Sequence, residues 1–212
     1  FEQAITDVGA VSLQTRKQIE PLEQLALQLG RSTKFTSTQA ANAMEVMARA
    51  GFKANEILTA TPAVLSAAAA SGLEIAEVAN HVSNVLKGMG LETAEAARVS
   101  DVLALASART NSSIGSLGES MKNVASTAKQ LNVPLEQVVA GVALLQDVGL
   151  DASVAGSAFN TMLTKMAAPT TAMQKKMRRL GISFKDSKGD MLPLTKVLDN
   201  FNKASRRVGG NF

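Results

Sequence analysis

Apolar residues recur three and four positions apart along most of the chain, which is the spacing of one buried face of an α-helix. Several of these stripes end at a glycine that is followed at once by Phe, Leu or Ile. The five predicted helix stops of this kind are Gly51, Gly72, Gly90, Gly149 and Gly181. Glycine adopts the left-handed conformation beyond a helix without a Cβ clash, and the apolar residue after it packs back onto the last turn. The pattern therefore predicts a succession of short helices.

The segments that follow the stops resemble one another. They read GFKANE from Gly51, GLEIAE from Gly72, GLETAE from Gly90 and GLDASV from Gly149, with NVPLEQ from Asn132 as a looser copy. Neighbouring copies are 17 to 21 residues apart, except for a double step of 42 residues between Gly90 and Asn132. A recurring short unit predicts a stack of short helices and argues against one long rod.

Stripes, caps and stops together define the predicted helices. Gly30 is expected to end the second helix, and Thr36 and Gln39 have the spacing of a capping box for the third. Thr61 followed by Pro62 is typical of an N-cap and a first helical residue, so a break is expected near residue 60. The predicted ranges are 1–12, 19–29, 36–50, 51–60, 62–71, 74–89, 93–108, 114–131, 134–148, 151–167, 171–180 and 194–206.

The most regular apolar spacing begins at residue 114 and predicts a seam for a partner helix. The seam consists of Ile114, Leu117, Met121, Val124, Ala128 and Leu131. We expect the partner in the chain itself, in the helix over 134–148, because a short connection makes neighbouring helices antiparallel. An intermolecular coiled coil is the alternative.

The pattern changes near the C-terminal end of the chain. Ile182 and Phe184 alternate with polar residues and lead into a turn, which predicts a small β-hairpin. The predicted turn residues are Ser187, Lys188 and Gly189. The last helix is expected to fade into Gly209 and Gly210.

The predicted fold class is all-α: a compact array of short amphipathic helices and helical hairpins, with the small β-hairpin near the C-terminus. We expect three parts. Residues 1–30 form the end of an upstream helix and a linker helix, residues 31–168 the helical core domain, and residues 169–212 a basic helix, the hairpin and a final helix. Pro169 marks a hinge between the last two parts. Because the chain begins at Phe1 without an initiator Met, we interpret it as an excerpt of a longer polypeptide.

Composition removes several functional classes. The chain of 212 residues has no Cys, which excludes disulfides, thiolate zinc sites and thiol catalysis. Its only aromatic residues are seven Phe, so the Trp and Tyr that usually stack on sugars and unpaired bases are missing. Even the Ala-rich stretch over 62–79 contains two Glu, so no run is apolar enough to span a bilayer. We expect no cofactor and no small-molecule substrate.

Charge is concentrated at one end of the chain. Residues 1–164 carry 11 Lys and Arg against 15 Asp and Glu, whereas residues 165–212 carry 11 against 3. The densest basic group lies on the predicted helix over 171–180 and consists of Lys175, Lys176, Arg178 and Arg179. Such a group can meet an anionic surface, although a solvated helix face is the more common reason for it.

Catalytic patterns are weak. His81 is the only histidine and lies one position from an apolar stripe, with no thiol to activate and no acid identified by spacing. The acidic candidates for a glycosidase or a metal site fall at predicted helix starts, where negative charge favours the helix dipole. They are Glu74, Glu77, Glu92 and Glu95. We expect no enzymatic activity and no metal site.

Four segments carry a resemblance to a known family. They are FTSTQAANAMEVMARAGFKANEIL over 35–58, GMGLETAEAARVSDVLALAS over 88–107, AGSAFNTMLTKMAAPT over 155–170 and GISFKDSKGDMLPL over 181–194. Together and in this order they resemble the core region of phage tail tape measure proteins, and the resemblance spans nearly the whole chain. It implies a virion protein of the tail lumen or tip, made in the bacterial host cytoplasm and encoded by a phage or a prophage.

The resemblance also implies a role and partners. Tape measure proteins set tail length during assembly and leave the tail during genome ejection. The implied partners are the tail tube, tail tip or initiator proteins and tail assembly chaperones, with several copies of the protein together in the lumen. Transient contact with the host membrane or phage DNA is a further expectation. The alternatives to a structural role are a peptidoglycan-degrading module and a membrane-active or DNA-guiding module used during genome entry.

The glycine stops distinguish this region from a ruler. One continuous helix of 212 residues would reach roughly 320 Å at about 1.5 Å per residue. Because the stops forbid such a helix, we expect a compact module at one end of the ruler. The expected contact surfaces are the seam Ile114, Leu117, Met121 and Val124 and the basic group Lys175, Lys176, Arg178 and Arg179.

Overall fold

Eleven α-helices and one short 3-10 helix form the described part of the chain, which confirms the all-α prediction. The computed structural model describes residues 1–187, 189 and 191–207. The elements are α1 Glu2–Ser12, α2 Arg16–Ser32, α3 Ser37–Arg49, α4 Ala54–Ser71, α5 Ile75–Met89, η1 Thr93–Glu95, α6 Ala96–Arg109, α7 Ile114–Gln130, α8 Leu135–Asp147, α9 Ala152–Ala167, α10 Thr171–Leu180 and α11 Leu194–Arg207.

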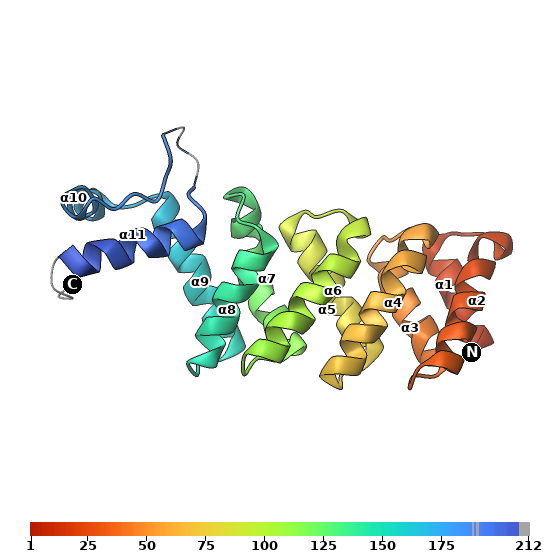
Figure 1. The fold of residues 1–212 in the computed structure, drawn as a ribbon. Coiled ribbons are helices and arrows are strands. Elements are labelled where there is room, and N and C mark those ends of the chain that lie inside the picture. Colours follow the sequence, from red (N-terminus) through yellow and green to blue (C-terminus); the bar gives the residue numbers. More distant parts are fainter. Residues whose placement is uncertain (188, 190, 208–212) are drawn as a thin grey trace.

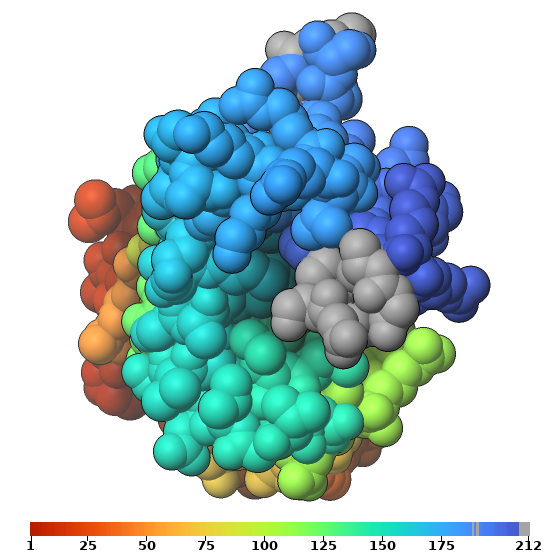
Figure 2. Space-filling model, turned by 90° about the vertical axis from the view of Figure 1, so that its left-hand side faces the viewer, coloured from red at the N-terminus to blue at the C-terminus, as the bar shows by residue number. Residues whose placement is uncertain are grey.

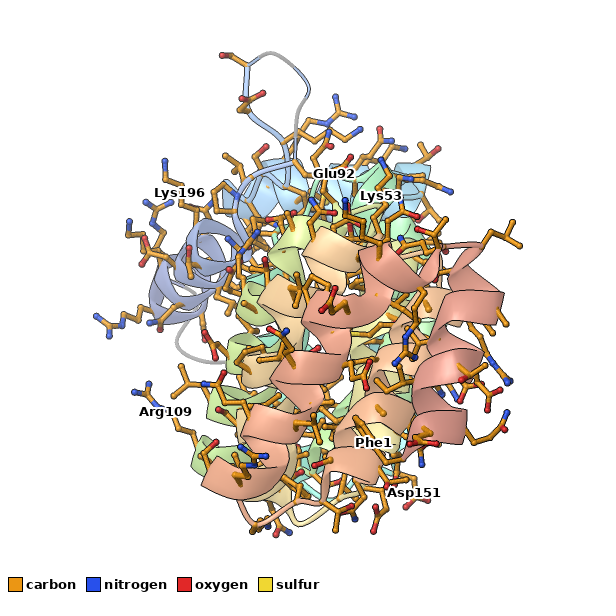
Figure 3. The ribbon with its side chains drawn as sticks, turned by 90° about the vertical axis from the view of Figure 1, so that its right-hand side faces the viewer. Phe1, Lys53, Glu92, Arg109, Asp151 and Lys196 are labelled. Atoms are coloured by element: carbon orange, nitrogen blue, oxygen red, sulfur yellow. The ribbon has the colours of Figure 1, made fainter. Side chains whose placement is uncertain are left out.

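Helices α1 to α9 form a row of two layers (Figure 1). The odd-numbered helices lie side by side in one layer and the even-numbered helices in the other, because each helix packs on the helix two places later. Consecutive helices alternate in direction. Lys53 and Glu92, which precede α4 and η1, therefore lie at one end of the layers, and Phe1 and Asp151, which precede α1 and α9, lie at the other (Figure 3).

The row repeats one pair of helices every 38 or 39 residues. The residues just before α3, α5, α7 and α9 are Thr36, Glu74, Ser113 and Asp151. The spacing of 17 to 21 residues in the sequence is half of this repeat, because similar segments begin both members of a pair. Repeats of this kind bury apolar surface against their neighbours, and one continuous core accordingly runs from α1 to α9.

The five predicted glycine stops all have positive φ angles, between 64° and 97°. At four of them the residue after the glycine donates its N–H to the carbonyl five residues back, as from Phe52 to Met47 at 3.1 Å. This is the Schellman arrangement. Gly72 ends α4 with a single bond from its own N–H to Ala68 at 3.0 Å.

Two predicted helix boundaries are wrong. Helix α2 passes through Gly30 and ends at Ser32; Gly30 instead allows α3 to approach, since a Cβ atom there would lie 2.5 Å from the backbone nitrogen of Ser37. Helix α4 passes through Pro62, which lies on its exposed face. Thr61 faces the core and donates its hydroxyl to the carbonyl of Ile57 at 2.6 Å, so it caps nothing. Burial of a continuous apolar stripe outweighs the lost proline hydrogen bond.

The predicted β-hairpin is also wrong. Within the described residues there is only one isolated antiparallel bridge, between Lys185 and Met191. The Ser183 hydroxyl accepts from the Lys185 N–H at 3.2 Å and so competes with strand pairing. Pro193 lacks an N–H and precedes α11, which ends the returning arm. Three residues of these predictions, Lys188, Gly209 and Gly210, lie outside the described residues.

The C-terminal segment has a small core of its own. Its buried members are Met166, Ile182, Phe184, Val197 and Ala204. The rings of Phe184 and Phe201 lie 5.8 Å apart. Residues 1–30, by contrast, contribute α1 and most of α2 to the main core as the first pair of the row. The division of the chain at residues 30 and 168 remains a proposal.

Candidate interaction surface

The predicted seam lies inside the protein. Ile114, Leu117, Met121 and Val124 are fully buried. Helix α7 packs mainly on α5 and α9, its neighbours in the odd layer, and less on α8, which was its predicted partner. The difference arises because α8 belongs to the other layer. The seam is therefore an internal surface in this fold, and a partner would have to separate the layers to reach it.

Glycines let the helices of the odd layer approach closely. A Cβ atom on Gly156 of α9 would lie 2.3 Å from the backbone oxygen of Ser120 on α7, and one on Gly118 would lie 2.2 Å from His81 on α5. Ser120 donates its hydroxyl to the carbonyl of Ala152 at 2.6 Å and accepts from Gln146 of α8 at 2.8 Å. Polar groups buried at this junction are thus paired, as buried polar groups require.

The basic group lies on the surface of α10. Lys175, Lys176, Arg178 and Arg179 are all exposed, and within the described residues none has a carboxylate partner within 4.0 Å. The apolar residues of the same helix, Met177 and Leu180, pack on the small C-terminal core. Helix α10 therefore presents its cations outward and is free to meet an anionic surface.

A large apolar groove separates the end of the row from the C-terminal segment. Figure 2 looks onto this end, with α8 and α9 below α10 and with α11 at the right. The groove has a volume of about 840 Å³. Its floor comes from α8 and α9, and α11 forms the opposite wall. The residues that shape it most are Leu144, Phe159, Met162, Val197, Leu198 and Phe201. Sequence reasoning missed this groove, although the apolar residues on the outer faces of α8 and α9 were its signal.

The rim of the groove has one acidic residue whose charge is already paired. Arg98 donates from Nε and Nη2 to the two carboxylate oxygens of Glu136, at 2.8 and 3.0 Å, and also hydrogen-bonds Glu95. The hydrogen bond from Arg98 lowers the pKa of the Glu136 carboxyl and raises that of the guanidinium. Lys165 on the same rim has no carboxylate within 4.0 Å in the described part of the chain.

The weak catalytic candidates do not converge. His81 is buried with its Nε2 atom 3.7 Å from Glu77, on its own helix. Glu74 precedes α5 and Glu92 precedes η1, as the helix-start interpretation expects, and Glu95 pairs with Arg98. In residues 1–187, 189 and 191–207 no group of three His, Cys, Asp or Glu could hold a metal ion.

No single described helix meets the length and hydropathy needed to cross a membrane. Helices α4 and α5 meet them only as a pair, which bends by 116° at its break.

Comparison with known proteins gives a consistent picture. The sequence profile of the family described as phage-related minor tail protein matches residues 23–210. The "Tape measure protein" of Pneumococcus phage Dp-1 is 36% identical over 205 residues, 97% of this chain and 18% of that protein. The "Probable tape measure protein" of Escherichia phage P2 is 29% identical over 177 residues, 84% of this chain and 22% of that protein. The chain thus spans about a fifth of the length of these curated relatives. No solved structure matches it significantly.

Proposed function

The chain belongs to the phage-related minor tail protein family, and from this we propose that it is a folded interaction module of a tape measure protein. The observation that carries the proposal is the similarity of nearly the whole chain to one part of a tape measure protein. The helix pairs support it, because a row of α-helical repeats offers extended surfaces for partners.

The proposed role has two stages. The full protein sets the length of the tail during assembly and leaves the tail during genome ejection. The module lies in the tail lumen or at the tip, where several copies meet tail tube, tail tip, initiator or chaperone proteins. The helical ruler lies elsewhere in the protein, because the glycine stops and reversals of this segment prevent one long helix.

The length-setting part of the proposal is tested in the phage that encodes the chain. An in-frame deletion of helical sequence outside this segment shortens the tail by about 1.5 Å per residue removed, measured by electron microscopy. A matched substitution series that keeps the length and helical character of the deleted part leaves the tail length unchanged. Tails of normal length after the deletion contradict the proposal.

The basic group of α10 is the proposed contact for an anionic partner. The double variant Lys175→Glu and Lys176→Glu folds normally, because both side chains are exposed. It weakens docking to the isolated tail tip complex in a pull-down measured at two salt concentrations. A matched control reverses two exposed cations of α2, Lys17→Glu and Arg31→Glu. Docking that both variants retain in full removes the α10 contact from the proposal.

A further inference from the structure

We propose that the groove at the C-terminal end of the row binds an α-helix of a partner protein, and that this helix has an apolar stripe and acidic flanks. The inference deepens the function proposed above and rests on it for the setting in which the partner is met. Its physical basis lies in three features of the groove: its register in the repeat, its size and its charge.

The repeat register shows what kind of element fits the groove. Seven and eleven residues after the residue that precedes each odd helix are His81 and Val85 in α5, and Ser120 and Val124 in α7. All four are buried, because the next odd helix covers them. The list of equivalent positions ends in α9 with Ala158 and Met162.

Those α9 positions are uncovered. Ala158 is exposed, and the side chain of Met162 is 39% exposed. Leu144 of α8, on the same end of the row, is 60% exposed. Both Ala158 and Met162 line the groove. The groove is therefore a continuation of the helix-on-helix interface that runs through the protein, at a place where the described chain supplies no further helix of the row.

The described helices of the row are 11 to 18 residues long, which sets the length of the helix that the groove can take. Such a helix would lie along α9 and present residues at positions i, i+4, i+7 and i+11 to Met162 and Leu144. The wall formed by Leu198 and Phe201 would contact its other side. A partner with one narrow apolar stripe fits this shape.

Charge selects an acidic partner. Residues 165–212 carry 11 basic and 3 acidic residues, and Lys165 lies on the rim itself. The acidic rim residue, Glu136, is neutralised by Arg98. A helix with Glu or Asp beside its apolar stripe therefore meets complementary charge, and a basic helix meets repulsion.

A second copy of the chain is a poor occupant for the same reason. Two copies joined through their grooves would bring two strongly basic segments together. In a head-to-tail contact the groove would meet the opposite end of the row, where the surface of α2 carries Arg16, Lys17, Glu20 and Glu23 rather than an apolar stripe.

The test uses three synthetic 18-residue peptides with a fluorescent label. One has Leu at positions 3 and 4 apart and Glu elsewhere, the second has Lys in place of Glu, and the third shuffles the first so that no stripe remains. Fluorescence anisotropy with the 212-residue chain is expected to show saturable binding of the Glu peptide. We expect at least tenfold weaker binding of the Lys peptide and no saturation by the shuffled one.

Matched variants locate the binding. Leu144→Glu and Met162→Glu each weaken the Glu peptide at least tenfold, whereas Leu105→Glu, at a 52% exposed position of α6 outside the groove, leaves it unchanged. Lys165→Glu weakens the Glu peptide and strengthens the Lys peptide. Circular dichroism of each variant checks the fold, and all four positions are exposed or half-buried in the free protein.

Three results overturn the proposal. They are equal binding of the Glu and Lys peptides, binding that Leu144→Glu and Met162→Glu leave intact, and dimerisation in sedimentation experiments that Leu144→Glu abolishes, which would assign the groove to a second copy. Peptide binding needs no assembled tail. Its failure therefore leaves the length-setting experiment unaffected, and normal tails after the ruler deletion leave the peptide result unaffected.

Discussion

The row α1 to α9 and the segment after Pro169 solve the problem of burying an apolar helix face in different ways. In the row, each helix is covered by the helix two places later, and the core is continuous. After Pro169 the chain leaves this register, and α10 and α11 cover a core of only five buried residues. The comparison shows that a repeat protein leaves its last apolar face open unless another element caps it.

The two regions also differ in charge. The row is slightly acidic and the C-terminal segment is strongly basic. Because the open groove lies at the junction, it combines an apolar floor with a basic surround. Neither region has this combination alone, which is why the junction is the strongest candidate for a docking surface.

The largest expected effect contrasts a buried leucine of the row with an exposed leucine of the C-terminal segment. Leu117→Asp places a carboxylate in the core, and we expect it to reduce the free energy of unfolding by more than about 5 kcal/mol and to abolish folding. Leu198→Asp, at a 66% exposed position, costs less than about 1 kcal/mol. Urea unfolding followed by circular dichroism measures both. A soluble, folded Leu117→Asp protein would contradict the burial of the seam.

The next effect tests the close approach of α7 and α9. Gly156→Ala puts a methyl group 2.3 Å from the backbone oxygen of Ser120, so we expect it to destabilise the protein by about 3 kcal/mol. Gly115→Ala in α7 is the matched control, because its nearest contact is an ordinary 3.6 Å. The control should gain up to about 1 kcal/mol from helix propensity. Thermal melting that shifts equally in both variants would show that the two helices lie farther apart.

The smallest expected effect is a pH dependence at the junction. The pKa of Glu136 is lowered in the folded state by its hydrogen bond with Arg98. The ion pair therefore stabilises the fold above the unfolded-state pKa, and this contribution is lost as the pH falls through the folded-state pKa. Because both side chains are about half exposed, it amounts to less than about 1 kcal/mol. The difference in melting temperature between wild type and Glu136→Gln should shrink on acidification; a difference that grows would contradict the pairing.

Local signals predicted most of the helices. The capping box at Thr36 and the positive φ angles at the five glycine stops are properties of a few neighbouring residues, so the sequence reveals them directly. The stripe over residues 114–131 likewise identified a buried face. Its partner was misassigned because the layer that a helix joins depends on the whole repeat, which has twice the period of the glycine segments.

Local signals failed where burial over a longer range decided the structure. Thr61 and Pro62 favour a helix start, yet the inward face of α4 continues through them. Ile182 and Phe184 alternate as in a strand, yet both side chains are buried in the small core beneath α11 without a second strand beside them. The groove could not be predicted at all, because its two walls are 36 or more residues apart between Phe159 and Thr195 and meet only in the folded chain.

The most direct test of this account is a cryo-electron microscopy map of the assembled tail in which residues 1–207 can be traced. We expect the two-layered row at one end of the tape measure protein, with an additional helix from another tail component lying along α8 and α9. A map in which residues 51, 72, 90 and 149 lie within one uninterrupted helical filament would contradict the fold, and a row whose α8 and α9 face is open to solvent would contradict the docking surface.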